Sequence, residues 1–575
     1  MKVLALLVGQ FWGWLVAGYL VGSIPFGVLI AGPRVLTEGS KSYGTSNVLR
    51  LFGAKKAALT LLCDLSKAAV MAKLVLIQMN GSQELAILVG YAAILGHSYP
   101  VWFGFRGGKG VAALLGLGLV LDHQVILAAL AVFLIVLGFS RYISLSSMIA
   151  AVSFVLFMYL KGDASVATQL VVLFIALHVI VAHRGNISRL LNGTEDMFLV
   201  KKLQVPEGVE LGCFTIHATS DNLEDVKRLA ARKYGFVRHL PAWLVYVLLP
   251  LTPVLIAGHS DVIVASDGSK IILVFIVVPM TPKQMKLFAW WAVRRIVLAA
   301  RIGEKMGAKQ LGLGAFTAIV GDHGLQVAKA ANIAVTTGNS ATAVLAVEGA
   351  LCAALKMGNE PEQCTAAVPG ATGQTGGGIA RLLAGRVKHI LLVGRDVNDP
   401  RLARLQRELA SAPFGVTSSI VTLEQALSSA QIIIVATSAT EPILVDPELL
   451  LPGAVVCDVA RPRAVAEEVH RQRDDVLVID GGLGKVPGNP NLGFEFGLGR
   501  GNAFGCMIET MLLVIMGIDH DFSIGEELEW EQLLLMSKMQ SLGFELGPLR
   551  YDDAVLTDEE INQRRSAANQ RKEAR

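Results

Sequence analysis

The chain has 575 residues, which is long enough for two to four domains. Hydrophobic residues make up 53%, charged residues only 17%, and the mean hydropathy is +0.54, which excludes a disordered or fibrous protein and argues against a purely soluble enzyme. The net charge of +4 is too small at this length to indicate a nucleic-acid partner. The six cysteines form no CxxC pair, so neither a disulfide framework nor a metal site is predicted.

Apolar runs dominate the first 183 residues. Seven segments reach or approach the roughly 20 residues that a spanning helix needs. They cover, in chain order, about residues 3–31, 57–78, 84–103, 110–121, 124–139, 143–160 and 166–182. We therefore predict a multi-pass α-helical domain of about seven spans over residues 1–200, which places the protein in the cell membrane.

Basic residues gather in alternate loops between these segments, and the opposite set of loops holds only Lys161. Lys and Arg concentrate in cytoplasmic loops, so the basic set and everything after residue 183 are expected in the cytoplasm. The residues of the basic set are Arg34, Lys41, Arg50, Lys55, Lys56, Arg106, Lys109, Arg141, His183, Arg184 and Arg189. Asp64 and Lys67 lie three residues apart within the second segment, where one helix face allows them to pair.

The basic loops share one chemistry, because each places hydroxyl groups, amide groups or cations next to glycine. They read GSKSYGTSNVLR (39–50), GHSYPVWFGFRGGKG (96–110), SRYISLSS (140–147) and HRGNISRLLNGTE (183–195). Glycine lets backbone N–H groups approach an anion, while Lys and Arg supply charge. This pattern favours a phosphate site, and the alternative is that the loops only anchor the spans to lipid headgroups.

These loops, together with GSIPFGVLIAG (22–32), closely resemble the PlsY family of acyl-phosphate-dependent glycerol-3-phosphate acyltransferases over about residues 1–200. The resemblance implies transfer of an acyl group from acyl phosphate to the 1-hydroxyl of glycerol 3-phosphate, which gives lysophosphatidic acid without a cofactor. Ser144 and Ser146 are alternatives to the serine that it implies, and Lys41 departs from the glycine that the family usually has. The implied catalytic residues are Ser40, Arg50, Lys109, Ser147, His183, Asn186 and Glu195, and the implied phosphate-binding residues are Ser40, Arg50, Gly107, Gly108 and Lys109.

After about residue 200, short apolar strands alternate with helical stretches. This alternation is typical of a doubly wound, Rossmann-like α/β domain with a parallel sheet. The expected strands are TAAVPG (365–370), HILLVGR (389–395), SSIVTL (418–423), QIIIVATS (431–438), AVVCDVA (454–460) and VLVID (476–480). Two further stretches, 242–258 and 271–280, are very apolar. We expect them to be buried around an acyl chain or to dock on the bilayer, with membrane spanning as the alternative.

The first of these strands is followed by the turn GATGQTG (370–376) and then by a helical stretch. A glycine turn between a strand and a helix N-terminus is typical of a site for a dinucleotide pyrophosphate, and the alternative is a turn that serves packing only. Arg395 precedes Asp396 after the next strand and favours NADPH over NADH. The expected cofactor-binding residues are Gly370, Ala371, Thr372, Gly373, Gln374, Thr375, Gly376, Arg395, Ala436 and Thr437.

Cys506 follows a glycine-rich run and begins an apolar helix, whose N-terminus is expected to lower the pKa of the thiol and make it a nucleophile. The segments FTIHATS (214–220), LGLGAFTAIV (311–320), TTGNSATA (336–343) and AFGCMIETMLL (503–513) resemble long-chain acyl-(acyl-carrier-protein) reductases in the same order. The resemblance covers roughly residues 210–555. It implies that Cys506 takes an acyl group from an acyl carrier protein thioester, that NADPH reduces it to a fatty aldehyde, and that the turn at 336–339 lies near the nicotinamide or the acyl group.

The second half is accordingly divided into an acyl-binding part of the reductase (205–350), an NADP-binding domain (351–500), the cysteine helix with the C-terminal part (501–555) and a charged tail (556–575) that frays. Two alternatives stay open. One is an acyltransferase with a non-catalytic, NADP(H)-sensing domain. The other is an anion transporter or scaffold with a regulatory nucleotide-binding domain.

Overall fold

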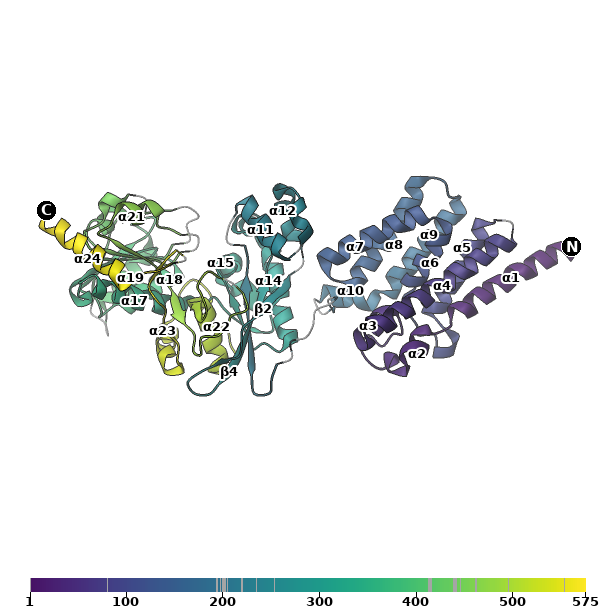
Figure 1. The fold of residues 1–575 in the computed structure, drawn as a ribbon, viewed down its shortest axis with the longest axis horizontal. Coiled ribbons are helices and arrows are strands. Elements are labelled where there is room, and N and C mark those ends of the chain that lie inside the picture. The colour runs from purple at the N-terminus through teal and green to yellow at the C-terminus, as the bar shows by residue number, and fades with distance from the viewer. Residues whose placement is uncertain are drawn as a thin grey trace. The chain divides into compact units, whose positions relative to one another are not determined.

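The computed structural model describes residues 2–574 except 80, 193–194, 197, 199–202, 204, 219–220, 234, 253, 412–415, 438–441, 445, 461–462, 495 and 553. The chain divides into two compact units, Met1–Lys201 and Lys202–Arg575, which Figure 1 draws in purple to blue and in teal to yellow. We call them the first and the second unit.

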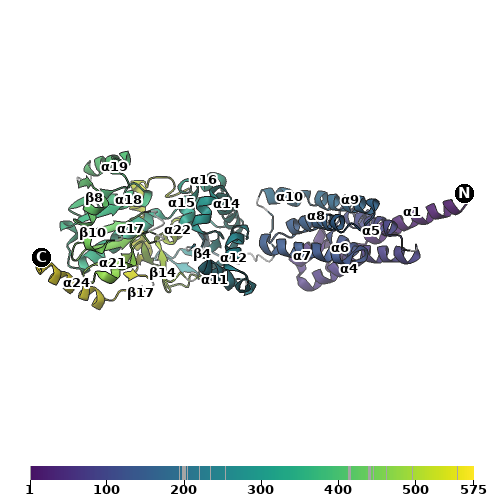
Figure 2. The ribbon, with the colours of Figure 1, turned by 90° about the horizontal axis from the view of Figure 1, so that it is seen from above.

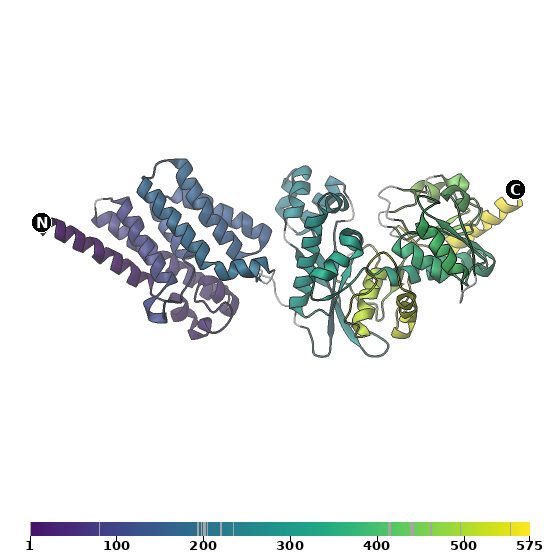
Figure 3. The ribbon, with the colours of Figure 1, turned by 180° about the vertical axis from the view of Figure 1, so that it is seen from behind.

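The regular elements among the described residues of the first unit are all helices. The contacts between α1 and α5, α7 and α8, and α4 and α6 are the most extensive of the bundle, and Figure 3 shows the packed helices from behind. Buried alanine, valine, leucine and isoleucine side chains fill the space between them. The helices are α1 (Lys2–Gly22), α2 (Phe26–Ala31), α3 (Thr45–Phe52), α4 (Ala54–Gln78), α5 (Gln83–Ser98), α6 (Val111–Leu121), α7 (His123–Ser140), α8 (Ile143–Lys161), α9 (Val166–Ala182) and α10 (Arg184–Leu191).

Helix lengths do not support the predicted count of seven spans. Each predicted segment does contain a helix, but among the described residues only three stretches are long and apolar enough to cross a membrane: Phe11–Ala31, Gln83–Phe103 and Ile143–Lys161. A fourth is possible if α9 and α10, which meet at 55°, count as one bent span. Helix α6 is too short, and α4 includes four lysines and one aspartate that lower its hydropathy.

The second unit begins with a mixed sheet in the order β2-β4-β1-β5-β6, and β3 pairs with the first two residues of β4. Strands β4, β1, β5 and β6 run parallel, and β2 and β3 are antiparallel to β4. The strands are β1 (Glu210–Ile216), β2 (Leu255–His259), β3 (Ile263–Val264), β4 (Lys270–Val277), β5 (Gln310–Leu313) and β6 (Ala334–Thr336).

A second sheet is entirely parallel, in the order β12-β11-β10-β7-β8-β9. All six strands fall on the six predicted segments, which confirms the α/β prediction. Their buried branched side chains face helices on both sides, as a parallel sheet requires. They are β7 (Thr365–Pro369), β8 (His389–Val393), β9 (Thr417–Ile420), β10 (Ile432–Val435), β11 (Val455–Asp458) and β12 (Leu477–Asp480).

Helix α17 (Asn339–Lys356) links the two sheets, because it packs against α18 (Gln374–Leu383) and α22 (Gly505–Ile515), and these helices lie close to it in Figure 2. Further helices and small strands complete the unit. They are α11 (Leu223–Lys233), α12 (Ala242–Leu248), α13 (Pro282–Leu287), α14 (Ala289–Met306), α15 (Phe316–His323), α16 (Leu325–Ala330), α19 (Pro400–Ala410), α20 (Leu423–Leu427), α21 (Glu467–Gln472), α23 (Trp530–Ser537), α24 (Asp558–Glu573), β13 (Leu483–Lys485), β14 (Asn502–Phe504), β15 (Glu545–Leu546), β16 (Arg550–Tyr551) and β17 (Ala554–Val555).

The structure decides one alternative that the sequence left open and overturns one expectation. The apolar stretch 271–280 forms β4, which is buried between β1 and β2, so it is a core strand and not a span. The charged tail does not fray. It folds into α24 because Thr557 and Glu560 form a capping box and because Ile561 and Ala568 are buried.

Candidate functional site

The glycine loop at 107–110 of the first unit rests on His97. The backbone N–H of Gly108 donates to the carbonyl of His97 at 3.0 Å, and the Tyr43 hydroxyl donates to the same oxygen at 2.7 Å. A Cβ atom on Gly108 would lie 2.0 Å from Nε2 of His97, so no larger residue fits there. Glycine is therefore needed to let this loop backbone pass directly over the imidazole.

A buried ion pair lies behind this histidine. The Lys67 ammonium is 2.9 Å from the Asp64 carboxylate and 3.3 Å from Nδ1 of His97. The three side chains are all at most 3% exposed. The spacing of Asp64 and Lys67 predicted their pairing, but their contact with His97, and through it with the glycine loop, could only be found in the folded structure.

The first basic loop is held by Asn47, which is buried at the start of α3. Its amide group donates to the carbonyls of Val35, Glu38 and Ser42, while its oxygen accepts from the backbone N–H of Ser40 at 2.9 Å. These bonds hold the exposed Ser40 in a fixed turn beside the loop's cations. Lys41 adopts a left-handed conformation with φ of 53°, which is the conformation that a glycine takes most easily.

Glu195 is the centre of a polar cluster. One carboxylate oxygen accepts from the Ser144 hydroxyl at 2.7 Å and from the Asn186 amide at 2.6 Å, and the other accepts from Arg189 at 2.8 Å. Burial raises the pKa of this carboxyl, but the hydrogen bonds from Asn186, Ser144 and Arg189 outweigh burial and hold the pKa below its ordinary value. Glu195 is thus an ionised brace that fixes Asn186.

The serine of the third loop that contacts this cluster is Ser144. Ser147, which the sequence favoured, is buried, and its hydroxyl donates to the carbonyl of Ile143 one turn back in α8. Ser146 donates in the same way to Tyr142. Sequence reasoning could not separate the three serines, because only the direction of the helix face toward Glu195 distinguishes them.

His183 lies buried at the bend between α9 and α10, three residues before Asn186. Its Nδ1 is 2.7 Å from the carbonyl oxygen of Val179. A carbonyl can only accept, so Nδ1 carries the proton and Nε2 is left as an acceptor in the neutral ring. The chain therefore presents a histidine whose orientation and tautomer are both set by the backbone.

Lys109 is electrostatically coupled to this cluster. Burial lowers the pKa of its ammonium to about 8, the Glu195 carboxylate partly offsets this, and Arg189 and Arg50 lower the pKa further. The charges of Glu195, Arg189 and Arg50 thus all act on the Lys109 ammonium. The exposed guanidinium of Arg50 pairs at 3.1 Å with Asp196, a contact that the sequence did not predict.

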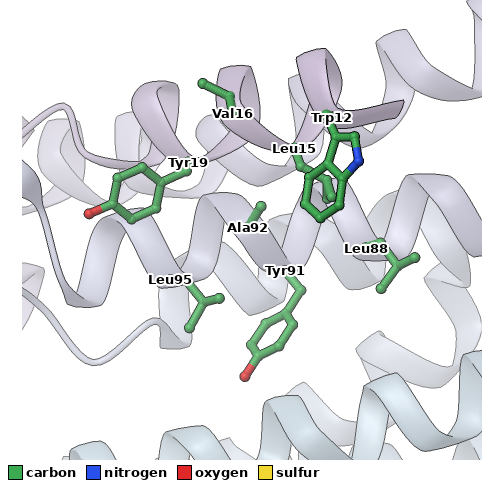
Figure 4. A pocket seen from close by; sticks show the side chains of 8 residues that line it. All are labelled: Trp12, Leu15, Val16, Tyr19, Leu88, Tyr91, Ala92 and Leu95. Atoms are coloured by element: carbon green, nitrogen blue, oxygen red, sulfur yellow. The ribbon is translucent and has the colours of Figure 1, made fainter. Parts of the chain in front are cut away.

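An apolar pocket of about 390 Å³ lies between α1 and α5 (Figure 4). Tyr19, Tyr91 and the Trp12 indole supply its polar atoms, and the Tyr19 hydroxyl donates to the carbonyl of Tyr99. The pocket has no charged lining residue, so it does not suit a phosphate. Its walls are Trp12, Leu15, Val16, Tyr19, Leu88, Tyr91, Ala92 and Leu95.

In the second unit, the glycine turn lies between β7 and the N-terminus of α18. Gly370 has φ of 94°, and a Cβ atom on it would lie 2.2 Å from the carbonyl oxygen of Ala436 and 3.2 Å from the nitrogen of Thr437. A Cβ atom on Gly376 would lie 2.1 Å from the carbonyl oxygen of Gly370. These two glycines allow tight packing of strand, turn and helix. Gly373, by contrast, is exposed and meets nothing closer than 3.4 Å.

The other residues expected at the cofactor lie around this turn. The N–H of Ala371 donates to the carbonyl of Val393, which ends β8, and the Thr372 methyl lies against Gly394. Arg395 follows at once and is exposed, and Thr375 is half-buried in the first turn of α18. Gln374 is different, because its buried amide bonds Asn339, Thr337 and the carbonyl of Ser523, so it ties the turn to neighbouring segments.

Cys506 is the second residue of α22 and packs against the turn at 336–339. The expectation of a lowered thiol pKa was wrong. Burial raises the pKa of Cys506 to about 12, the N–H of Met507 lowers it only in part, and the nearby Glu509 carboxyl raises it further. Glu509 is itself buried, hydrogen-bonded to Thr336, and has a pKa raised mainly by burial. The half-buried cysteine therefore gains no net lowering of its pKa from its place at the start of α22.

The first unit combines helices that are long and apolar enough to cross a membrane with lysine and arginine side chains near Glu195, which is typical of the class of membrane proteins that bind an anion. A family model described as glycerol-3-phosphate acyltransferase matches residues 12–193. The curated glycerol-3-phosphate acyltransferase of Desulfotalea psychrophila is 42% identical over 186 residues, which are 31% of this chain and 92% of that protein. That of Brucella suis is 40% identical over 187 residues, which are 32% of this chain and 90% of that protein. The chain belongs to the glycerol-3-phosphate acyltransferase family through this part.

A solved structure that is described as a glycerol 3-phosphate acyltransferase is also similar to this part of the chain. It is PlsY (YgiH), described as an integral membrane glycerol 3-phosphate acyltransferase in its glycerol 3-phosphate form, and it is 35% identical, covering 33% of this chain and 96% of that one with a TM-score of 0.32.

The second unit contains a domain similar to the dehydrogenases. A family model described as shikimate / quinate 5-dehydrogenase matches residues 353–480. The solved shikimate 5-dehydrogenase from Listeria monocytogenes, in complex with shikimate and NAD, is 10% identical with a TM-score of 0.27 and covers 49% of this chain and 89% of that one. L-tryptophan dehydrogenase from Nostoc punctiforme is 13% identical, also with a TM-score of 0.27, and covers 64% and 90%. This similarity is not specific to acyl-(acyl-carrier-protein) reductases.

Proposed function

We propose that the first unit transfers a fatty acyl group from acyl phosphate to the 1-hydroxyl of glycerol 3-phosphate and so makes lysophosphatidic acid. The observation that carries this proposal is the cluster in which Glu195 fixes Asn186 while Lys109, Arg189 and Arg50 surround it with positive charge. Family membership supplies the substrate, and the cluster supplies groups that suit it.

Phosphate binding falls to Lys109 and Arg50 in this proposal, with Ser40 and the N–H group of Gly107 as further donors. The N–H of Gly108, which the sequence also assigned to the phosphate, donates instead to the carbonyl of His97. The pair of Arg50 and Asp196 is largely exposed, and such pairs are worth about 0–1 kcal/mol, so a phosphate dianion can replace the carboxylate at small cost. Because burial makes the Lys109 ammonium poorly solvated, an incoming phosphate is a strong partner for it.

The acyl transfer needs a base and an orienting group more than a strong nucleophile, since phosphate is already a good leaving group. The 1-hydroxyl oxygen attacks the acyl carbonyl, Nε2 of His183 takes the hydroxyl proton, and the bond from carbonyl carbon to phosphate oxygen breaks. Asn186, held by Glu195, is placed to orient the hydroxyl or the carbonyl. Inorganic phosphate leaves, and the base returns its proton to it.

The test uses membranes that contain the full chain, supplied with acyl phosphate and glycerol 3-phosphate. Lysophosphatidic acid should form, and His183→Ala should reduce its rate strongly. Ser146→Ala, which removes a buried hydroxyl of α8 that donates to the backbone carbonyl of Tyr142, should not. A chain that is folded and inserted but makes no lysophosphatidic acid would show that the altered first loop has lost acyl transfer.

For the second unit we propose an NADPH-dependent reductase that acts on a fatty acyl thioester of acyl carrier protein and releases a fatty aldehyde. One observation favours it over a simple binding domain. The turn at 336–339 contacts the glycine turn through Gln374 and contacts Cys506 through Gly338. A nucleotide held by the glycine turn would therefore lie near the segment that packs against the thiol.

The glycine turn suits a dinucleotide, because the open surface beside Gly373 leaves room for a pyrophosphate at the start of α18, while Gly370 and Gly376 serve packing. Arg395, which is exposed directly after β8, is the cation that we propose for a 2′-phosphate. When bound, NADPH would supply the hydride that reduces a thioester. The chain's own contribution is Cys506, which would exchange its proton for the acyl group as the carrier's thiol leaves.

The experiment supplies the same membranes with acyl carrier protein thioester and NADPH and follows fatty aldehyde. Aldehyde that depends on Cys506 would support the reductase. Nucleotide binding without aldehyde would favour the NADP(H)-sensing domain, and transport of anions across vesicles without either product would favour the transporter or scaffold. In this proposal the second unit lies in the cytoplasm, where NADPH and acyl carrier protein occur.

A further inference from the structure

A row of large apolar side chains is exposed on one part of the second unit. Trp243 and Val247 lie one turn apart on α12, and Leu251 follows in the next turn, each about 60% exposed. Leu287, Phe288 and Trp290 are exposed where α13 gives way to α14. Single exposed apolar residues are ordinary, but a group of this size marks a surface that binds something.

The two stretches form one surface because polar contacts join their inner sides. The Trp291 indole donates to the carbonyl of Pro250 at 2.9 Å. This bond holds the segment that contains Trp290 against the segment that contains Leu251. Farther along, the Gln284 amide donates to the carbonyl of Tyr246 at 2.7 Å. We call the six residues Trp243, Val247, Leu251, Leu287, Phe288 and Trp290 the aromatic ridge.

The charge around the aromatic ridge is positive. From Pro282 to Arg301 the chain has five Lys and Arg residues and no Asp or Glu. Lys283, Lys286 and Arg294 are exposed, and the Arg294 guanidinium lies 5.3 Å from the ring centre of Trp290. Tryptophan and phenylalanine among cations are the composition that settles at the headgroup level of an anionic bilayer.

We infer that the aromatic ridge docks on the anionic surface of the bilayer in which the first unit is inserted. The short segment between Leu191 and Glu210 joins the two units, so the bilayer is always within reach of the second one. A weak surface contact then suffices, because the tether supplies the high local concentration that a free protein would lack. The inference rests on membership of the membrane family and not on either proposed reaction.

The test uses the full chain in vesicles of phosphatidylcholine with phosphatidylglycerol, made with ordinary or with brominated phosphatidylcholine. Bromine quenches tryptophan emission within the bilayer. Comparison of the wild type with Trp243→Phe/Trp290→Phe isolates the emission of these two indoles from that of the other tryptophans. The bromolipid should remove most of this difference emission. The triple variant Lys283→Glu/Lys286→Glu/Arg294→Glu should restore it, because the docking needs positive charge.

A matched control is Lys388→Glu/Arg407→Glu/Lys538→Glu, which changes charge equally at exposed positions elsewhere and should keep the quenching. Difference emission that bromolipid leaves unchanged in a folded chain would overturn the inference and leave the aromatic ridge to a protein partner. Equal quenching in vesicles of phosphatidylcholine alone would overturn the requirement for an anionic surface. Circular dichroism of each variant establishes that it is folded.

Discussion

Cys506 fills the space that a side chain on Gly338 would need. Gly338 has φ of 77°, and a Cβ atom on it would lie 2.2 Å from both Cα and Cβ of Cys506. The cysteine and the turn at 336–339 are therefore packed as one piece, although 168 positions separate them in the chain. This contact is what places a thiol beside the segment that Gln374 joins to the glycine turn.

The first prediction concerns Cys506. Cys506→Ala should abolish formation of fatty aldehyde and leave lysophosphatidic acid formation unchanged, because the two sites lie in separate compact units. Both products are measured in the same membranes. Since burial keeps the thiol neutral, iodoacetamide should label Cys506 much more slowly than a free cysteine at pH 7. Loss of both products, or of neither, would contradict a two-site enzyme.

The second prediction separates nucleotide binding from packing in the glycine turn. Gly373→Ala introduces a methyl group that the fold has room for, so the melting temperature should stay the same while the Kd for NADPH rises at least about tenfold through lost pyrophosphate contacts. Gly370→Ala should instead lower the melting temperature, because its φ is 94° and its Cβ would meet the carbonyl of Ala436. Unchanged NADPH affinity in Gly373→Ala would place the nucleotide elsewhere.

The third prediction is a pH dependence that Lys109 sets. Burial lowers its pKa to about 8, so the ammonium is present below pH 8 and is lost above it. The kcat/KM for glycerol 3-phosphate should therefore fall by about tenfold per pH unit above pH 8. Lys109→Arg keeps its charge and should flatten this fall, although at a lower overall rate, since arginine presents a planar fork. A fall that persists in Lys109→Arg would assign the ionisation to another group.

The fourth prediction concerns the support of the glycine loop. Gly108→Ala should reduce acyl transfer at least about 100-fold, because the methyl group would displace the loop from His97 and with it Lys109. Gly138→Ala in α7, where a Cβ atom meets nothing within 4 Å, is the matched control and should keep full activity. The lysophosphatidic acid assay with equal amounts of inserted protein measures both. Full activity in Gly108→Ala would mean that the loop tolerates movement.

The composition of the chain and its local patterns determined the main architecture. Apolar runs mark the helical first unit, and alternating strands mark the parallel sheet, because burial of apolar surface follows periodicity that neighbouring residues already carry. The glycine spacing at 370–376 likewise indicated its turn, since Gly370 needs a conformation that other residues avoid. The pairing of Asp64 with Lys67 follows from one helical turn.

Only the tertiary structure decided which polar groups meet. Ser144 rather than Ser147 bonds Glu195 because of how α8 is rotated against the chain near residue 195, and no spacing within the sequence records that rotation. The neutral thiol of Cys506 has the same kind of cause. A helix N-terminus can be read from a glycine-rich run, but burial, which raises the pKa, comes from segments far away in the chain. Long-range packing sets both the partners and the dielectric environment of a side chain.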